Sequence, residues 1–244
     1  MSLIPFGSQI IFEEAKEQGL HPEWETEFGL FSVQHNGKTR YVYSTHLLIN
    51  STLGAYLTKD KYTTNKILEK HGFPIIPYIF TKNIQEVNHF FDQYNPIIAK
   101  PVMGEQAHDV KLITHHDHIT NYPLDETLFE KFIQGEEYRY LVLQGKVVAA
   151  QSKNLAPTAQ YPWRKYITNL EPTEYKDSFK DMALKIAELV GLGLIAVDFL
   201  LDDAGKPYVL ELNSAPGLYS LYNPDKGNPI KVGKLLLEII LNSS

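Results

Sequence analysis

The feature that most constrains the fold is a pair of apolar segments near the C-terminus, joined by a short polar turn. The segments cover residues 194–201 and 208–212, and the turn between them reads Asp-Asp-Ala-Gly over residues 202–205. Runs of Ile, Val, Leu and Phe on both sides of such a turn predict a β-hairpin with two buried faces. The rest of the chain must therefore supply elements that cover both faces.

This hairpin carries three oxygen-bearing side chains, Asp198, Glu211 and Asn213. If it closes around Ala204 and Gly205, the numbers of opposed residues add up to about 409, so that Asp198 faces Glu211. The two-residue period of a strand puts Asn213 on the same face as Glu211. Two carboxylates forced together repel unless a cation lies between them, and Mg²⁺ prefers oxygen ligands. The pattern predicts a magnesium site, and the alternative is that both carboxylates face solvent on a one-sided sheet.

Composition narrows the class of protein. The 244 residues are 43% hydrophobic and 21% charged, which excludes a disordered chain or a coiled coil. The absence of cysteine excludes disulfides, thiolate metal sites and a cysteine nucleophile, and it favours a cytoplasmic location. The N-terminus lacks a signal-peptide pattern and no apolar run is long enough to span a membrane. A net charge of -6 argues against nucleic acid as a partner.

Helix and strand patterns alternate along the chain, which predicts an α+β (α/β) fold. Residues 8–18 have helical spacing, and residues 28–33 and 39–43 are expected to pair around Asn36-Gly37. Further helices are expected over 58–71 (capped by Thr58), 83–94, 175–190 and 230–241, and further strands over 75–80, 96–100, 110–114, 127–133, 137–143 and 147–152. The middle strands are interpreted as a meander, and residues 153–172 as a long functional loop.

Five segments, taken in order, resemble the ATP-grasp ligases, most closely the ATP-grasp domain of cyanophycin synthetase and of the bifunctional enzymes that make glutathione. They are D-K-Y-T-T-N-K-I-L-E-K-H-G-F-P (60–74), I-I-A-K-P (97–101), E-K-F-I-Q-G-E-E-Y-R (130–139), A-V-D-F-L (196–200) and V-L-E-L-N-S-A-P-G (209–217). The resemblance covers residues 56–240. It implies two α+β subdomains that clamp ATP, over residues 56–134 (lid and hinge) and 135–244 (metal and substrate), after a reduced N-terminal segment of residues 1–55.

The resemblance also implies a role for individual residues. Lysines would meet the ATP phosphates, a hinge strand would meet the adenine, and a glutamate would bind the ribose. Of two further cations, one would lie near the transferred phosphate or the substrate, and the other would face the acyl phosphate. The nucleotide-binding set is Lys61, Lys100, Glu130, Lys131, Phe132, Ile133 and Glu137, the catalytic set is Arg139 and Lys153, and the metal set is Asp198, Glu211 and Asn213. The alternatives are ordinary surface lysines and polar positions of a plain hairpin.

Some residues depart from the family pattern. The lid segment P-V-M-G-E-Q-A-H-D-V (101–110) has Gly104 as its only glycine, where the relatives carry several.

Histidines cluster between His108 and His118, and this cluster is either a transition-metal site or a solvated turn. Arg164 either grips a substrate carboxylate or stacks on Trp163.

The function implied is that of an ATP-dependent carboxylate–amine ligase, which uses ATP and Mg²⁺ (or Mn²⁺) and forms an acyl phosphate. The partners expected are a small-molecule carboxylate and an amine, from an amino acid or peptide. The oligomeric state is left undecided, with a homo-oligomer as one option. Neither a membrane nor nucleic acid is expected as a partner. The alternatives are a nucleotide-binding module without ligase activity, and an ATP-dependent ligase that modifies a protein.

Overall fold

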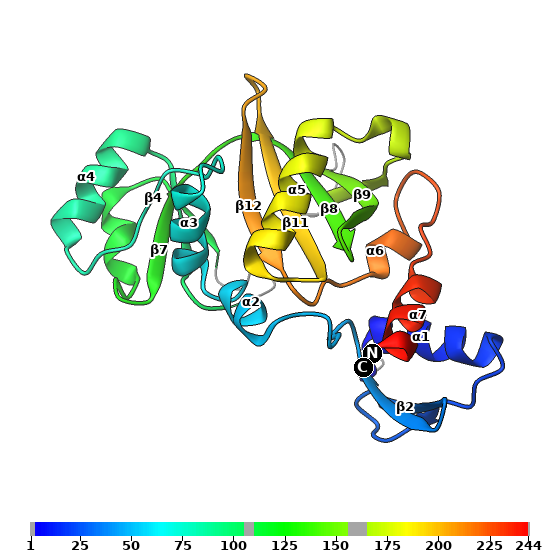
Figure 1. Ribbon diagram of the computed structural model, residues 1–244. Coiled ribbons are helices and arrows are strands. Elements are labelled where there is room, and N and C mark those ends of the chain that lie inside the picture. The colour runs from blue at the N-terminus through cyan, green and yellow to red at the C-terminus, as the bar shows by residue number, and fades with distance from the viewer. Residues whose placement is uncertain (1–2, 105–109, 156–164, 244) are drawn as a thin grey trace. The chain divides into compact units, whose positions relative to one another are not determined.

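The computed structural model describes residues 3–104, 110–155 and 165–243 (Figure 1). The chain forms two compact units. The first contains Met1–Ala55, Tyr138–Val197 and Asn213–Ser244, and the second contains Tyr56–Glu137 and Asp198–Leu212. Helices and antiparallel sheets are mixed throughout, so the predicted α+β class is confirmed. No helix within the described residues has the length and apolar character needed to cross a membrane.

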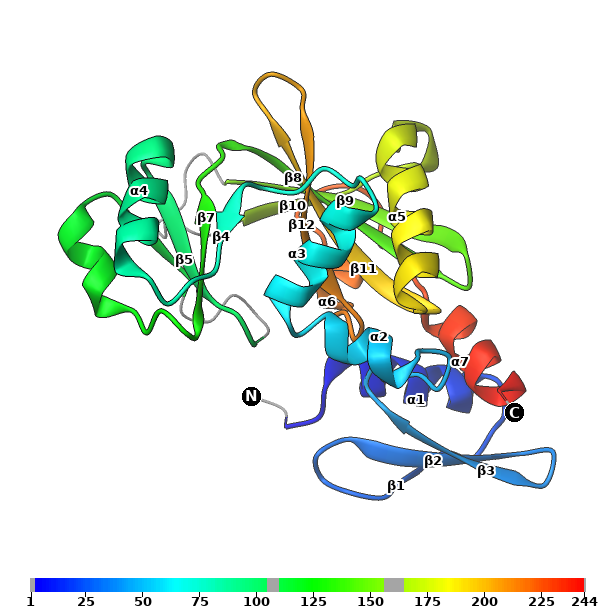
Figure 2. The same cartoon turned by 60° about the vertical axis from the view of Figure 1, so that its left-hand side comes forward.

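The N-terminal part of the first unit is a helix followed by a small sheet. Helix α1 (Phe6–Glu17) precedes the strands β1 (Glu23–Trp24), β2 (Leu30–His35) and β3 (Lys38–Tyr43), which pair in that order (Figure 2). Asn36 and Gly37 have φ angles of 49° and 72°, as the predicted two-residue hairpin turn requires.

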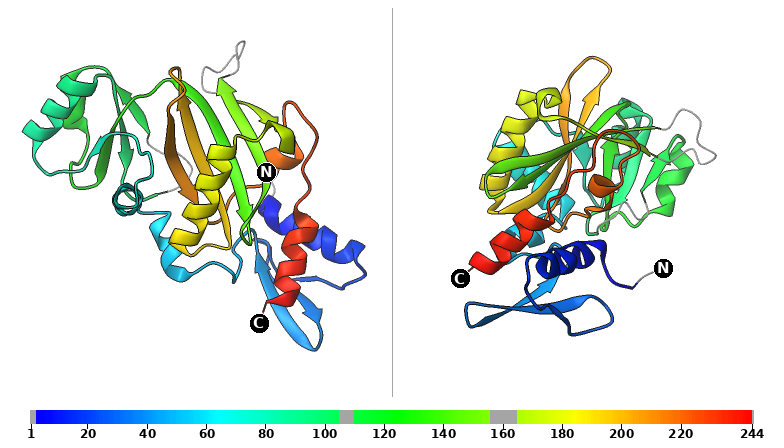
Figure 3. Two further views of the ribbon diagram at one scale, coloured as in Figure 1. Left: turned by 45° about the horizontal axis from the view of Figure 1, so that its top comes forward. Right: turned by 90° about the vertical axis from the view of Figure 1, so that its right-hand side faces the viewer.

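Helix α1 also packs against helix α7 (Gly233–Asn242), so helices from the two ends of the sequence lie side by side (Figure 3). The buried residues of this contact come from both helices and from β2 and β3, and they are Ile11, Phe12, Ala15, Phe31, Val42, Leu236, Leu237 and Ile240. Burial of this apolar surface holds the N-terminal segment in the first unit.

The five-stranded sheet contains the predicted C-terminal hairpin, which carries Asp198, Glu211 and Asn213. Its strand order is β10-β9-β8-β11-β12. The bounds are β8 (Gly135–Leu143), β9 (Lys146–Leu155), β10 (Lys165–Asn169), β11 (Leu194–Asp202) and β12 (Pro207–Asn213). Helix α5 (Asp177–Val190) packs on β9 and ends at Gly191, whose φ of 67° gives the left-handed cap of a helix C-terminus. The remaining elements around the sheet are α2 (Thr52–Leu57), η2 (Pro172–Glu174) and α6 (Tyr219–Tyr222).

The second unit has a four-stranded sheet of order β4-β7-β5-β6. These strands are β4 (Tyr78–Ile79), β5 (Ile97–Pro101), β6 (Lys111–Ile113) and β7 (Thr127–Lys131), and the other elements are α3 (Lys61–Lys70), α4 (Ile84–Tyr94) and η1 (His116–Asn121). Helix α4 packs on one face of the sheet through Val87, Phe90 and Phe91, against Ile97 and Phe129 among others.

Three local expectations are wrong. The middle strands do not form one meander, because β7 lies between β4 and β5 and belongs to a different sheet from β8. The segment 153–172 contains strand β10, which pairs with β9. Helix α3 begins at Lys61 rather than after Thr58, because the Asp60 carboxylate accepts a hydrogen bond from the Thr63 N–H (2.9 Å) and caps the helix there.

Candidate functional site

The turn that joins β11 to β12 differs by one residue from the predicted geometry. The Asp202 N–H donates to the Lys206 carbonyl (3.0 Å), and the Gly205 N–H donates to the Asp202 carbonyl (2.8 Å). Gly205 has a φ of 79°, so the loop has three residues and ends in a glycine bulge. Asp202 therefore pairs with Lys206 instead of Pro207, which corrects the register expected next to the turn.

The three predicted metal ligands belong to this hairpin. Asp198 lies in β11 and is 6% exposed, whereas Glu211 in β12 and Asn213 at its end are half-buried. The Ala215 N–H donates to Asn213 Oδ1 (2.9 Å), so this side chain is held in one orientation and a lone pair of its oxygen is still available. The donor chemistry fits a hard divalent cation, since every ligand atom is an oxygen and two of the groups carry negative charge. In the described parts of the chain, no group of three or more His, Asp and Glu side chains could hold a metal.

The structure brings two of the predicted nucleotide-binding residues together. Lys100 Nζ lies 2.7 Å from Glu130 Oε1, and the two side chains are 9% and 7% exposed. The register explains the pairing: Lys100 is opposite Leu128 on β7, so Glu130 is its diagonal neighbour on the same face of the sheet. Helix α3 adds Asn65, whose Nδ2 lies 3.4 Å from the same carboxylate oxygen. A lysine ammonium is thus held on the sheet face opposite to the α4 core.

Lys61 is the second lysine expected to contact phosphate. It is the first residue of α3, and its Nζ donates to the carbonyl of Gly104 at 2.7 Å. The Lys61 N–H also donates to the Val102 carbonyl (3.0 Å). Both contacts attach the start of α3 to the segment after β5, which leads into the predicted lid. Residues 105–109 of that lid, with His108, lie outside the described residues.

The predicted hinge follows strand β7. The N–H groups of Lys131 and Phe132 donate to the carbonyls of Pro77 and Pro96 at 2.9 and 3.1 Å, so these two amides are already engaged. Ile133 packs on an apolar cluster formed by Ile76, Leu200 and Tyr208. The sequence reasoning missed this cluster. A signal for it was present in the sequence. Residues two apart on a strand share a face, so Leu200 was expected on the same face as Asp198.

The other predicted site residues lie on strands β8 and β9. Glu137 and Arg139 are two residues apart on β8 and both are half-buried, so they share a face of that strand. Lys153 lies in β9 opposite Ile167 of β10. Arg164 lies outside the described residues.

A network of buried amides near Lys153 was not predicted. Gln151 Nε2 donates to Asn169 Oδ1 (2.7 Å), and the two residues are 1% and 3% exposed. Asn169 Nδ2 in turn donates to the carbonyls of Leu221 and Asn228, both at 2.8 Å. Ser220 Oγ donates to Gln151 Oε1 at 3.0 Å. These contacts attach β9 and β10 to residues 220–228. The network was not predicted because single amides in a polar loop give no sequence signal of their partners.

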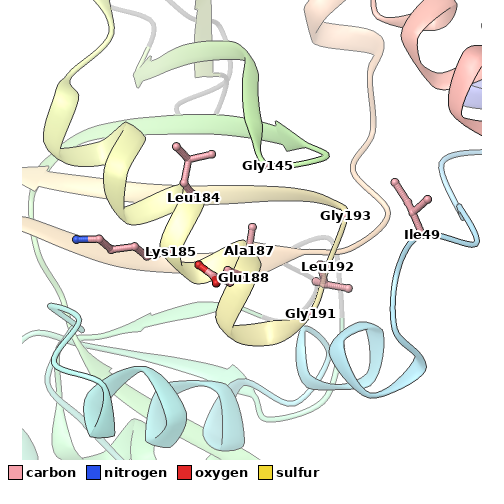
Figure 4. Close-up of a pocket in the computed structure, with 9 residues that line it drawn as sticks. All are labelled: Ile49, Gly145, Leu184, Lys185, Ala187, Glu188, Gly191, Leu192 and Gly193. Carbon is pink, nitrogen blue, oxygen red and sulfur yellow. The ribbon is translucent and has the colours of Figure 1, made fainter.

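Two further features lie outside the predicted nucleotide-binding, catalytic and metal sets. In the histidine cluster, His116 Nε2 lies 2.8 Å from Asp92 Oδ1, and the rings of His115 and His118 meet edge to face. A pocket of about 430 Å³ lies beside the end of α5, and it is lined by residues of that helix and by Gly145, Gly191 and Gly193 (Figure 4). Ile49 lines the same pocket.

Known structures identify the fold. The bifunctional glutathione synthetase from Pasteurella multocida matches with a TM-score of 0.72 over 97% of this chain and 44% of that chain, at 13% sequence identity. At this identity the likeness concerns the fold alone. The class that the structure defines is the ATP-grasp fold, as the sequence motifs predicted.

The sequence comparison then gives the family. The chain belongs to the RimK-like ATP-grasp domains, whose family model matches residues 58–240. It is 28% identical over 191 residues to the coenzyme gamma-F420-2:alpha-L-glutamate ligase of Methanococcus maripaludis, covering 70% of this chain and 64% of that protein. It is 27% identical over 184 residues to the D-alanine--D-alanine ligase B of Clostridium perfringens, covering 68% and 60%. The match thus spans somewhat less than two thirds of these relatives.

Proposed function

We propose that this chain binds ATP with Mg²⁺ and joins a carboxylate to an amine. The observation that carries the proposal is the buried ammonium of Lys100, held 2.7 Å from Glu130 beside the hinge segment of an ATP-grasp family member. A buried lysine that is paired with a carboxylate can exchange that partner for a phosphate oxygen, because both are anionic acceptors. Ile133 and the apolar cluster around it then offer a surface for the adenine ring.

The reaction needs positioned charges and no side-chain nucleophile. A substrate carboxylate oxygen attacks the γ-phosphorus, ADP leaves, and an acyl phosphate results. The amine nitrogen then attacks the acyl carbon, loses a proton, and phosphate leaves. Bound Mg²⁺ would neutralise negative charge on the phosphates. Asp198, Glu211 and Asn213 would hold it.

Four cationic side chains would act on the phosphates and the acyl phosphate. Lys61 and Lys100 would bind ATP oxygens, and Arg139 and Lys153 would stabilise the charge that spreads over the transferred group. Glu137 would accept hydrogen bonds from the ribose hydroxyls. The relatives are named as glutamate and D-alanine ligases, which supports an amino acid or peptide as substrate.

The test is phosphate release from ATP over a panel of amino acids, peptides and hydroxy acids. Asp198→Asn and Glu211→Gln should each lower turnover at least about a hundredfold, since each removes one of two charges from the metal set. Asp203→Asn removes a carboxylate from the exposed turn of the same hairpin and serves as the matched control, with turnover unchanged. Wild-type turnover in either metal-set variant, with Mg²⁺ as the only metal, would overturn the assignment.

The same assay separates the two other functions. A nucleotide-binding module would be stabilised by ATP, yet no member of the panel would stimulate phosphate release. A protein-modifying ligase would add mass to a partner protein and not to a free amino acid. Either result would replace the proposed small-molecule ligation.

A further inference from the structure

The side chain of Asn50 bridges both strands of the metal-set hairpin at its open end. Its Nδ2 donates to the carbonyls of Leu194 and Ser214, both at 2.9 Å, and its Oδ1 accepts from the Leu194 N–H at 2.8 Å. Leu194 is the first residue of β11, and Ser214 directly follows the last residue of β12. One amide from the N-terminal segment therefore fixes where the two strands begin and end relative to each other.

The contact with Ser214 leads directly to a predicted metal ligand. The Ser214 carbonyl and the Ala215 N–H belong to the same peptide group, which is planar and rigid. Asn50 holds the carbonyl edge of this peptide, and the N–H edge donates to Asn213 Oδ1 at 2.9 Å. Rotating the peptide would break both hydrogen bonds together. The orientation of the Asn213 side chain is thus coupled to Asn50 through a single peptide plane.

Other residues of the N-terminal segment hold the same stretch of chain. Thr45 Oγ1 donates to the Pro216 carbonyl at 3.1 Å, and Ser214 itself is buried. The Phe6 ring packs edge-on against Tyr219 and Tyr222, with centroid distances of 5.3 and 5.4 Å. The chain after β12 is therefore supported from residues 6–50, which precede the family match at residue 58.

We propose that Asn50 is a positioning residue for the metal site, which orients Asn213 Oδ1 through the Ser214–Ala215 peptide. The proposal rests on the function proposed above, in which Asn213 is a ligand of Mg²⁺. Groups that hold a ligand from outside the first coordination shell tune metal affinity, and their loss costs about 10- to 100-fold. The N-terminal segment thus contributes to the reaction although it lies outside the matched domain.

The test is Asn50→Asp, which keeps the shape and the acceptor for the Leu194 N–H but removes both donors. The Mg²⁺ concentration for half-maximal turnover should rise about tenfold, whereas the KM for ATP at saturating Mg²⁺ should stay unchanged. Hydrogen exchange of the ligand-free protein gives a readout that needs no activity, and the Ala215 amide should exchange at least about tenfold faster. Unchanged Mg²⁺ dependence in an active enzyme, or unchanged Ala215 exchange, would overturn the proposal.

Two control variants separate positioning from a general loss of stability. Asn223→Asp makes the same chemical change in the same unit, where Nδ2 donates to the Tyr219 carbonyl, and should leave the Mg²⁺ dependence as it is. Leu236→Val opens a small cavity in the core of that unit and should lower only the Tm. The same Mg²⁺ shift in Leu236→Val would show that Asn50 acts through stability alone.

The outcomes also distinguish this inference from the proposed function. If the wild-type protein releases no phosphate with any acceptor, the ligase function fails, and Ala215 exchange still decides whether Asn50 holds the peptide. If the wild type is active and Asn50→Asp keeps its Mg²⁺ dependence, only the positioning role fails.

Discussion

The two units each bury a polar cluster, and the clusters differ in charge. The second unit holds the ion pair of Lys100 and Glu130. The first unit holds neutral amides, with Gln151 donating to Asn169 and Asn169 donating to two backbone carbonyls. Both clusters are nearly inaccessible to solvent. Burial alone therefore does not separate a proposed binding residue from a structural one.

The difference lies in what each cluster does with its hydrogen-bonding groups. The amide network is made of neutral groups that find partners within the fold, so its main effect is to fix the segments it joins. A buried ion pair is a weak source of stability, because desolvation offsets the Coulomb attraction. Its presence in the second unit is explained best by the polyanion that we propose Lys100 to bind.

The largest effect is expected from breaking the charged cluster. Lys100→Met should lower the free energy of unfolding by about 3–5 kcal/mol, because it leaves the Glu130 carboxylate buried without its counter-charge. Adding Glu130→Leu should recover most of the lost free energy of unfolding, because no charge is then left buried alone. It should not recover ATP binding. Urea unfolding measures the first quantity and the ATP-induced rise in Tm measures the second.

A surface ion pair provides the matched control. Lys82 Nζ lies 3.8 Å from Asp125, and the two side chains are largely exposed. Lys82→Met should change stability by less than about 1 kcal/mol. If the double variant of Lys100 and Glu130 is no more stable than Lys100→Met, the loss does not come from an uncompensated charge.

A smaller effect is expected from the neutral cluster. Asn169→Leu should lower the free energy of unfolding by about 2–3 kcal/mol, since Gln151 and the carbonyls of Leu221 and Asn228 lose a buried partner. ATP affinity should stay as in the wild type, as isothermal calorimetry can measure. A loss of ATP binding together with a small stability change would contradict a purely structural role for the amides.

The smallest effect is expected from alkaline pH. Burial raises the pKa of Tyr140, Tyr175 and Tyr222 in the first unit above the ordinary value of 10.0. Between pH 10.0 and these raised values the unfolded chain has lost protons that the folded chain keeps, so stability falls as pH rises. The Tm should therefore decline above about pH 10. Tyr222→Phe should make the decline shallower, and an equal slope would exclude a contribution from this tyrosine.

The sequence predicted most elements but not all of their partners. Alternating apolar residues and the Asn36-Gly37 turn were sufficient for β2 and β3, because the signals are local. Strand β10 was missed since K-Y-I-T-N is short and polar at a sheet edge, where burial leaves no clear period. The placement of β7 between β4 and β5 could not be predicted, because a strand has the same pattern whichever neighbour it pairs with.

The candidate site was predicted as residue types and not as geometry. Lys100 and Glu130 were both named, yet their contact depends on the pairing of β5 with β7, which is 30 residues away in sequence. The turn between β11 and β12 was expected to have two loop residues, and the bulge at Gly205 shifted its register. Asn50 was missed altogether. A single polar residue before a helix gives no sequence signal that its side chain bonds a peptide group far along the chain, here Ser214–Ala215.

The packing of α1 against α7 has a consequence for biosynthesis. The first unit is assembled from three separate stretches of chain, the last of which begins at Asn213. The four-stranded sheet of the second unit is complete once Lys131 has left the ribosome, whereas α1 must wait for Leu236 and Leu237. During synthesis the part of the apolar face of α1 that packs on α7 is thus uncovered until these leucines are made, and a chain that stops before them would expose apolar surface that favours aggregation.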